Sequence, residues 1–233
     1  MDVIDVRGLL GLLISDGSLV PYRTPGGGYI QLTLTAGSSE SAFLEEKVDE
    51  FKQFIKTKAQ IVPYKTTPRP NGKTTSILRF RVSTNKLRPV YNLLYPVGER
   101  QITHTALDLL GAKAAAWTWA EGARLKGDGS SVLARVGSIL EEAIIISQWL
   151  SVLTGATAEI DSNYVKPRLR FNPEETRKIQ AALLDYAPKT RKHLFTGEQW
   201  DVGSISNART ELQLGEGQIG VERQKETSLV RNF

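Results

Sequence analysis

Residues 9–17 read LLGLLISDG, an apolar run that ends in an acid followed by glycine. Leucine is a strong helix former, and the run has neither the β-branched enrichment nor the alternation of a strand. Gly17 suits the position just after a helix, where a positive φ is favoured. The alternative is a hairpin turn at Asp16-Gly17, because Asp-Gly is a strong hairpin signal. This stretch alone leaves both interpretations open.

A second copy of the pattern favours the helix. Residues 114–122 read AAAWTWAEG, an alanine-rich run that also ends in acid and glycine. Alanine has the highest helix propensity. Gly11 and Ala116 are both small, which lets two helices approach closely. We therefore expect two paired helices that carry Asp16 and Glu121 to one shared site.

The position of the two acids is electrostatically unfavourable. A carboxylate in the last turn of a helix faces the negative end of the macrodipole, which costs roughly 0.3–1 kcal/mol. Two such acids brought together also repel each other. A divalent cation between them would offset both costs, and carboxylate oxygens suit Mg²⁺. For either acid alone, solvation at a frayed helix end is the simpler explanation, whereas the matched pair favours a site for Mg²⁺ or another divalent metal.

Composition sets the broad class. A chain of 233 residues, 40% apolar and 24% charged, can form one large domain or two smaller lobes of a soluble globular protein. The net charge of +5 permits a nucleic-acid partner without requiring one. The absence of cysteine excludes disulfides, thiolate metal sites and cysteine nucleophiles. His104 and His193 are too few and too isolated for a zinc cage.

Export and membrane insertion are not expected. No apolar run reaches membrane-spanning length. Asp2 and Asp5 stand where a signal peptide would be basic. We therefore predict an intracellular protein with no membrane partner.

The chain reads as an internal repeat. In the first half, after residues 9–17, we expect strands at 18–24, 29–35, 60–66 and 73–83, and helices at 38–56 and 85–95. In the second half we expect helices at 105–122, 139–154 and 174–186, and strands at 123–126, 131–136, 156–161 and 165–171. Each half thus has the order αββαββα, with a pseudo-two-fold axis between the paired helices. The predicted fold class is α+β, with repeats at 1–100 and 101–195 and a C-terminal extension at 196–233.

Basic residues recur at alternate positions of several expected strands. Lys166, Arg168 and Arg170 share one strand face because they are two positions apart. Arg79 and Arg81 repeat the pattern. The helix at 38–56 instead carries acids: Glu40, Glu45, Glu46, Asp49 and Glu50. Such a face can be an ordinary solvated surface, but its recurrence in both halves favours nucleic acid, since a sheet presenting Arg and Lys can enter a major groove.

The residues predicted to contact DNA lie on these strands and beside them. They are Arg23, Gln31, Thr33, Lys65, Lys73, Arg79, Arg81, Arg124, Lys126, Arg135, Lys166, Arg168 and Arg170.

These features resemble the LAGLIDADG homing endonucleases over roughly residues 3–195. In the first motif, the positions that agree are Leu9, Gly11, Leu12, Asp16 and Gly17. The second motif is degenerate, with Ala116 for glycine and Glu121 for aspartate, and Trp117 precedes the acid. The resemblance is to the monomeric, two-motif, intron-encoded branch, and it implies two pseudo-symmetric repeats that form a saddle-shaped antiparallel β-sheet.

The resemblance also implies an activity. The chain would be a monomeric, metal-dependent enzyme that cuts both strands of double-stranded DNA at a long pseudo-palindromic site. Asp16 and Glu121 would bind the metal, with the neighbouring Ser15 and Ala120 contributing to the metal site. Metal-activated water would attack the phosphate. The family usually has a basic residue after the third helix of each half.

The basic residues at those two positions are Arg100 in the first half and Arg191 or Lys192 in the second, and we assign Arg100 and Lys192 as catalytic. The implied compartment is an organelle, chloroplast or mitochondrion, or a bacterial or phage-infected cytoplasm.

Two other functions remain open. A protein of the same fold could bind nucleic acid without cutting it, as an intron RNA maturase, a regulator or an RNP component. The degenerate second motif leaves this alternative open. Intron RNA would then be the partner. An unrelated α+β enzyme with a carboxylate pair has little support, because no nucleophile–base constellation accompanies the acids.

Overall fold

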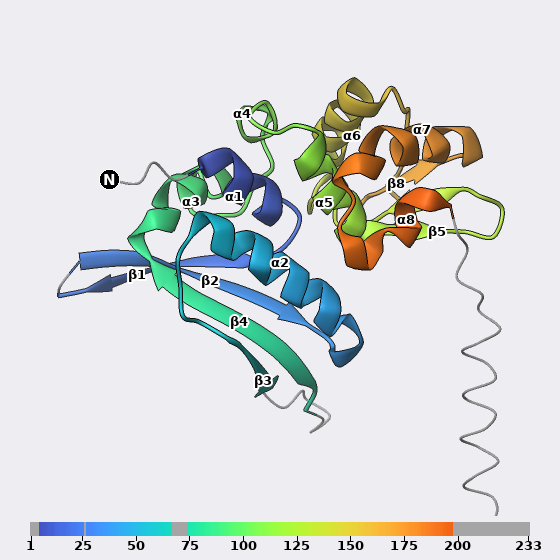
Figure 1. Ribbon diagram of the computed structural model, residues 1–233. Coiled ribbons are helices and arrows are strands. Elements are labelled where there is room, and N and C mark those ends of the chain that lie inside the picture. The colour runs from blue at the N-terminus through green and yellow to red at the C-terminus, as the bar shows by residue number, and fades with distance from the viewer. Residues whose placement is uncertain (1–4, 26, 67–73, 198–233) are drawn as a thin grey trace, which may run out of the picture. The chain divides into compact units, whose positions relative to one another are not determined.

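The computed structural model describes residues 5–25, 27–66 and 74–197 (Figure 1). The compact unit spans Met1–Glu198. The remaining unit, Gln199–Phe233, lies outside the described residues and so does almost all of the predicted extension. No helix of the described residues is long and apolar enough to cross a membrane.

The described residues form two αββαββα repeats, as predicted. The first repeat comprises α1 (Val6–Leu13), β1 (Ser18–Thr24), β2 (Gly27–Ala36), α2 (Ser41–Phe54), β3 (Ile61–Lys65), β4 (Ser76–Thr84) and α3 (Arg88–Leu94), with short 3₁₀ turns η1 (Ser38–Glu40) and η2 (Asn85–Leu87). The second comprises α5 (Ala112–Gly122), β5 (Ala123–Leu125), β6 (Ser131–Leu133), α6 (Leu140–Thr154), β7 (Glu159–Asp161), β8 (Arg168–Phe171) and α7 (Pro173–Leu183). Short elements flank the second repeat: α4 (His104–Leu107), η3 (Leu184–Tyr186), η4 (Lys189–Arg191) and α8 (His193–Thr196).

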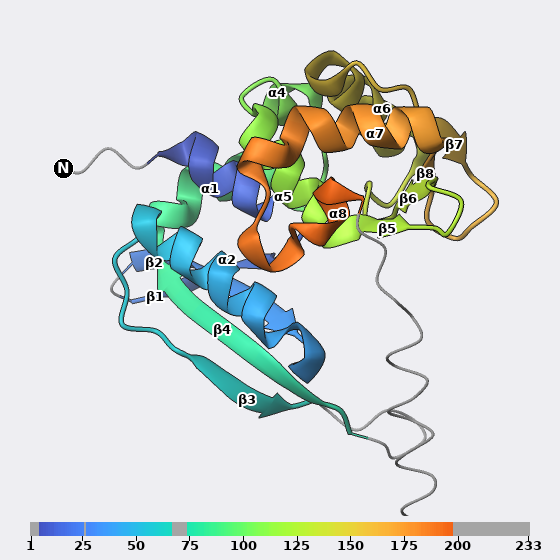
Figure 2. The ribbon, with the colours of Figure 1, turned by 45° about the vertical axis from the view of Figure 1, so that its right-hand side comes forward.

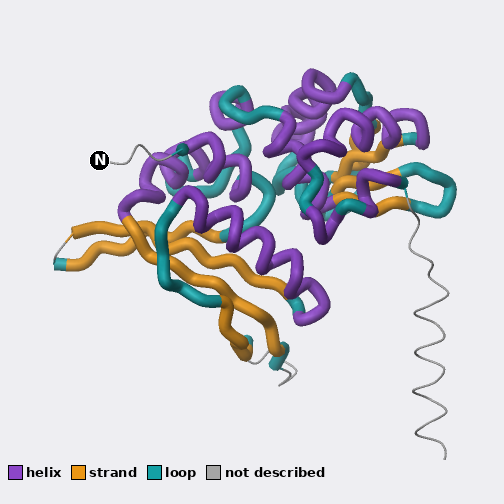
Figure 3. The backbone as a smooth tube through the Cα atoms, viewed as in Figure 1, coloured by secondary structure: helices purple, strands orange, loops and turns teal. Residues whose placement is uncertain are grey.

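Each repeat has its own four-stranded antiparallel sheet, and both sheets have the same topology (Figure 3). The strand order is β1-β2-β4-β3 in the first and β5-β6-β8-β7 in the second. In the first sheet Leu32 pairs with Leu19 and Val82, so buried apolar side chains share one face, and α2 lies against that sheet (Figure 2). The odd positions of β2 point to the other face, which we call the open face.

The second half departs from its predicted boundaries. The helix expected at 105–122 is two helices, because Gly111 adopts an extended conformation at the N-cap of α5. The strands of the second sheet are three or four residues long, shorter than expected. As a result Lys126 lies in the turn after β5 and Lys166 lies before β8.

Helix α1 begins and ends with identifiable contacts. The side chain of Asp5 accepts a hydrogen bond from the backbone N–H of Gly8 at 2.9 Å, which satisfies a free donor of the first turn. The helix ends at Leu13, so Asp16 lies beyond it and not in its last turn as predicted. Gly17 has φ +93°, the positive φ expected of it.

Close packing joins α1 to α5. A Cβ on Gly11 would lie 2.7 Å from the Cβ of Ala114, so glycine is required for this approach. The predicted small-residue seam is therefore present, with Ala114 and not Ala116 opposite Gly11. Ala116 is fully buried.

Polar side chains of helix α2 form hydrogen bonds and an ion pair with residues from the second half of the chain. The carboxylate of Glu46 accepts hydrogen bonds from the backbone N–H groups of Lys189, at 2.6 Å, and Thr190, at 2.9 Å. Glu50 pairs with Lys113 at 2.5 Å, and Glu40 pairs with Arg191. The acids of α2 and of the preceding η1 thus have specific partners in the second repeat and in η4 beside it, which the sequence interpretation did not foresee.

Candidate active site

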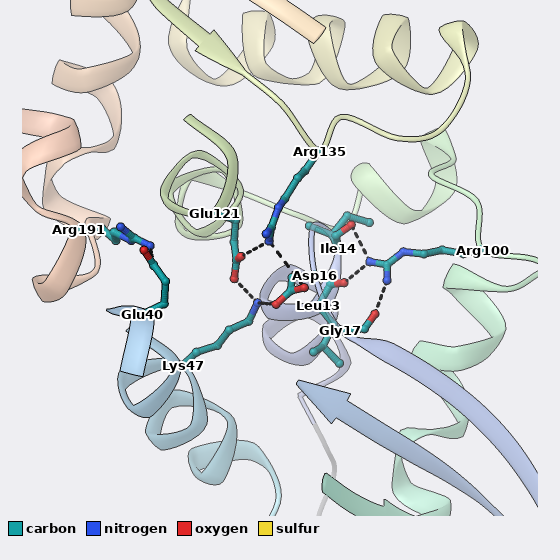
Figure 4. Close-up of polar contacts among 10 residues, drawn as sticks. All are labelled: Leu13, Ile14, Asp16, Gly17, Glu40, Lys47, Arg100, Glu121, Arg135 and Arg191. Atoms are coloured by element: carbon teal, nitrogen blue, oxygen red, sulfur yellow. Dashed lines mark hydrogen bonds and ion pairs between the residues drawn. The ribbon is translucent and has the colours of Figure 1, made fainter. Parts of the chain in front are cut away.

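The two acids of the repeated motif converge on one nitrogen atom (Figure 4). Lys47 Nζ, from α2, lies 3.3 Å from Asp16 Oδ2 and donates a hydrogen bond to Glu121 Oε1. On the other side Arg135 Nη1 lies 2.9 Å from Glu121 Oε2 and 3.8 Å from Asp16 Oδ1. Two carboxylates and two cations therefore alternate around a small ring.

Lys47 was not among the predicted site residues. Its side chain is 2% exposed, and it lies on the apolar stripe of α2, three residues after Leu44 and four before Phe51. Charged residues are almost never buried unless they are paired. A lysine in the middle of an otherwise apolar helix face was the signal in the sequence that could have identified it.

The environments of the two carboxyl groups differ. The Glu121 side chain is 4% exposed and the Asp16 side chain 29%. Burial, together with the nearby charge of Asp16, raises the pKa of Glu121 above its usual value against the opposing effect of Lys47. Burial also pushes the pKa of Asp16 upward, but the charge of Lys47, the Gly17 backbone N–H and Arg135 together hold it below its usual value.

Arg135 was predicted to bind DNA, and the structure places it beside the acids. Its φ of +64° is the only positive value at a described residue other than glycine. Such backbone strain clusters at functional sites. Its side chain is 53% exposed, so the guanidinium is open to a ligand while it contacts both carboxylates.

The two basic residues assigned from the resemblance have different surroundings. Arg100 donates hydrogen bonds to the backbone carbonyls of Gly17, Leu13 at 2.6 Å, and Ile14 at 3.1 Å. It therefore holds the turn that carries Asp16. Lys192 is exposed and is not among the residues that line the cavities beside the acids.

Two cavities border the acids. The larger, about 900 Å³, is lined by Asp16 and Arg135 and by the predicted DNA-contacting residues Thr33, Lys166 and Arg168. The smaller, about 510 Å³, has Lys47, Glu121 and Arg124 in its lining and shares Asp16 and Arg135 with the larger. Asp16 thus lies where the two cavities meet, and Glu121 borders the smaller one.

The protein groups available to a metal are few. Among residues 5–25, 27–66 and 74–197, no three acidic, histidine or cysteine side chains gather around one point. The hydroxyl of Ser15 is buried without a hydrogen-bond partner in the described residues, and Ala120 is also buried. Mg²⁺ is usually bound by one or two carboxylates together with water and substrate phosphates. The pair Asp16 and Glu121 fits that donor set.

The open face of the first sheet gathers several predicted contacts. Thr33 pairs with Arg81 across the sheet, and Gln31 donates a hydrogen bond to Ser83 Oγ at 3.1 Å. Arg79 lies 3.7 Å over the ring of Tyr64. Arg81 is exposed on this face.

The second sheet repeats part of this arrangement. Arg124, Arg168 and Arg170 share its outer face by the strand register. Arg168 lies 3.7 Å over the ring of Tyr164. Arg170 forms an ion pair with Asp161, so its guanidinium already has an acidic partner.

Three predicted contacts do not join these faces. Arg23 lies four positions after Leu19 on β1, and Lys65 four positions after Ile61 on β3. Each basic residue therefore shares the apolar face of the first sheet with that residue, at an exposed strand end. Lys126 lies in the turn after β5. Lys73 lies outside the described residues.

Comparison with known proteins identifies structures of similar fold and a matching family. Among solved structures, the homing endonuclease I-WcaI bound to its DNA recognition sequence gives a TM-score of 0.63 at 14% identity, covering 81% of this chain and 84% of that one. A variant of I-DmoI in complex with its target DNA gives 0.50 at 17% identity, covering 81% and 96%. At these identities the likeness establishes the fold. No curated protein matches the chain. The model of the LAGLIDADG DNA endonuclease family matches residues 7–179, and the chain therefore belongs to that family.

Proposed function

We propose that this protein is a divalent-metal-dependent endonuclease that cuts both strands of a specific double-stranded DNA site. The observation that carries the proposal is the convergence of Asp16 and Glu121, one from each repeat, on a single cationic nitrogen. Because one chain supplies both acids, a monomer contains the complete centre.

The sheets would bind the DNA and the acids would lie at its centre. The open face of the first sheet presents Gln31, Thr33 and Arg81, side chains that can donate to base edges or phosphates. Lys166 and Arg168 line the larger cavity together with Asp16. A duplex held on these residues would bring its backbone phosphates to the carboxylates.

Each residue of the centre has a distinct role in the proposed reaction. A divalent metal held by Asp16 and Glu121 would activate water and stabilise the leaving oxygen. Arg135, half exposed and next to both acids, would bind the phosphate being cut. Arg100 would act through the backbone, since its hydrogen bonds hold the turn before Gly17.

The related structures support the choice of substrate and cofactor. I-WcaI was solved with its DNA recognition sequence, and an I-DmoI variant with its target DNA in the presence of manganese. A DNA substrate would place the activity in an intracellular compartment that holds DNA, such as an organelle or a bacterial cytoplasm.

A cleavage assay tests the proposal. A plasmid library of candidate sites is incubated with the full chain and Mg²⁺. We expect linear product from the wild type, none with a chelator, and about a thousandfold slower cleavage by Asp16→Asn or Glu121→Gln, since metal supplies several kcal/mol of transition-state stabilisation. Both variants should still bind the DNA. The absence of metal-dependent cleavage at every site tested would overturn the proposal.

The second candidate is a nucleic-acid binder that does not cut. It is favoured by one observation, that the positive charges of Lys47 and Arg135 already balance the two carboxylates. This candidate predicts that the wild type binds a DNA site or an intron RNA tightly and leaves it intact in Mg²⁺. The same assay, with a gel-shift measurement on both nucleic acids, distinguishes the two candidates.

A further inference from the structure

The space between the two acids is held by the protein's own cation. Lys47 Nζ contacts Asp16 Oδ2 at 3.3 Å and is hydrogen-bonded to Glu121 Oε1. Mg²⁺ binds carboxylate oxygens at about 2.0–2.1 Å. An ion that touched both of these oxygens would need the volume that the ammonium group fills.

This lysine is built into the fold. Lys47 is 1% exposed and is surrounded on α2 by the buried Leu44, Val48 and Phe51. Among the described residues its ion-pair partners are Asp16 and Glu121. An ammonium group in such a place is costly without an anion beside it, so Lys47 stays between the acids unless another anion replaces them.

The formal charges of the centre cancel. Asp16 and Glu121 carry two negative charges, and Lys47 and Arg135 carry two positive ones. A neutral cluster attracts a divalent cation weakly. A DNA phosphate would change the balance, because it adds negative charge at the centre and offers the two cations another partner.

We infer that Lys47 is the resident counter-ion of the carboxylate pair and competes with divalent metal for Asp16 Oδ2 and Glu121 Oε1 in the DNA-free protein. Metal and DNA binding are then coupled: DNA increases the affinity for metal, and by linkage metal increases the affinity for DNA by the same factor. The inference rests on the proposed metal-dependent function and adds the residue that withholds metal until DNA is bound. Lys47 is thus a positioning residue, because it acts through the two carboxylates.

The test measures Mn²⁺ binding to the DNA-free full chain by electron paramagnetic resonance, which distinguishes free from bound ions. We expect Lys47→Met to bind Mn²⁺ roughly tenfold or more tightly than the wild type, within the usual range of coupling between sites. Lys47→Arg keeps a cation there and should stay close to the wild type. Lys52→Met is the matched control: it removes the same charge from the same helix, at a half-buried residue that is not in contact with the acids. Glu121→Gln added to Lys47→Met should abolish the gain.

Equal Mn²⁺ affinities of the wild type and Lys47→Met would overturn the inference. If the wild type also cuts DNA, the proposed function stands and only the role of Lys47 fails. If the wild type never cuts DNA, the proposed function fails whatever the Mn²⁺ affinities are.

A measurement on the unmodified protein covers the case in which Lys47→Met does not fold. The side-chain Nζ and Cε signals of Lys47 are followed by NMR, with assignment from Lys47→Arg. We expect them to stay unchanged with Ca²⁺ alone and to shift when a bound DNA duplex and Ca²⁺ are both present. A shift with Ca²⁺ alone, or none with both, contradicts the inference.

Discussion

The two repeats bring an acid to the same point by different local structures. Asp16 lies in a turn beyond the end of α1, at Leu13, with a positive φ at Gly17. Glu121 lies inside α5, which continues to Gly122. The first repeat adds a buried cation, Lys47, and the second adds an exposed one, Arg135. Matching sequence motifs therefore predict a shared location but not the same backbone or the same exposure.

The glycines that follow the acids show the same difference. Gly17 is needed for its conformation, since its φ is +93°. Gly122 is needed for space, because a Cβ there would lie 2.2 Å from the carbonyl oxygen of Ala134. Glu121 therefore lies at a helix end whose geometry differs from the turn that carries Asp16. Both side chains nevertheless contact the ammonium group of Lys47.

The sheets differ in extent as well. The central strands β2 and β4 of the first sheet have ten and nine residues, whereas β6 and β8 of the second have three and four. The first repeat therefore offers the longer open face. If both sheets bind one duplex, the half-site on the first repeat should have the larger share of side-chain contacts.

The largest expected effect on stability is at Lys47, and the matching substitution at Arg135 is its comparison. Lys47→Met should lower the free energy of unfolding by about 3–5 kcal/mol, because it leaves two carboxylates, one fully buried, without their shared partner. Arg135→Met should cost less than about 1 kcal/mol, since its side chain is half exposed and solvent screens the pair. Urea denaturation of both variants in a metal chelator measures the difference, and equal losses would contradict it.

The two glycines should respond differently to substitution. Gly122→Ala should cost about 1–3 kcal/mol through overpacking against backbone, and Gly17→Ala roughly 1–2 kcal/mol through the left-handed conformation. Asparagine tolerates a positive φ, so Gly17→Asn should be milder than Gly17→Ala. Gly122→Asn should be no milder than Gly122→Ala. Thermal unfolding of the four variants provides the check, and a rescue by asparagine at both positions would disprove the distinction.

Paired arginines on the two sheets test the difference in DNA binding. Arg81 is exposed on the open face of the first sheet and has no ion-pair partner among the described residues. Arg81→Ala should weaken specific binding by about 1–3 kcal/mol if it reads a base. Arg170→Ala should have a smaller effect on DNA affinity, because Asp161 already binds this guanidinium. Fluorescence anisotropy at several salt concentrations measures both, and a larger loss for Arg170→Ala would reverse the assignment.

The smallest expected effects concern how stability depends on pH in the metal-free protein. The contributions of Asp16 and Glu121 to the free energy of unfolding should change in opposite directions as pH rises. The pKa of Asp16 is lowered in the folded state from its usual 3.8, so its contribution to stability is present above 3.8 and is lost as pH falls through the folded-state pKa. The pKa of Glu121 is raised from 4.5, so its contribution is present below 4.5 and is lost as pH rises through the folded-state pKa.

Stability should therefore change differently with pH in the two variants. As pH rises from the folded-state pKa of Asp16 to 3.8, the difference in the free energy of unfolding between wild type and Asp16→Asn should grow. As pH rises from 4.5 to the folded-state pKa of Glu121, the difference in the free energy of unfolding between wild type and Glu121→Gln should shrink. Denaturation at a series of acidic pH values follows both gaps, and slopes of the same sign would refute this prediction.

Sequence reasoning could predict features that depend on local pattern. The repeated order of elements in the two halves, the positive φ of Gly17 and the alternation on β4 all follow from local sequence patterns. It also anticipated helix α7, whose Asn172 accepts a hydrogen bond from the Glu175 N–H at 2.9 Å. These features need no knowledge of how distant segments meet.

Features that depend on tertiary contacts were missed or misplaced. The early end of α1 coincides with hydrogen bonds from Arg100, far along the chain. Strand register decided that Arg23 and Lys65 lie on the apolar face of the first sheet. Lys47 required the knowledge that α2 passes beside both acids, although its place on an apolar stripe was a visible sign.

A double-variant cycle tests most directly whether Asp16 and Glu121 form a single centre. Plasmid cleavage rates are measured in Mg²⁺ for the wild type, Asp16→Asn, Glu121→Gln and the double variant. Because residues that act as a unit are strongly non-additive, we predict that the double variant is no slower than the slower single variant. Losses that multiply in the double variant would mean that the two carboxylates act independently and would contradict the shared centre.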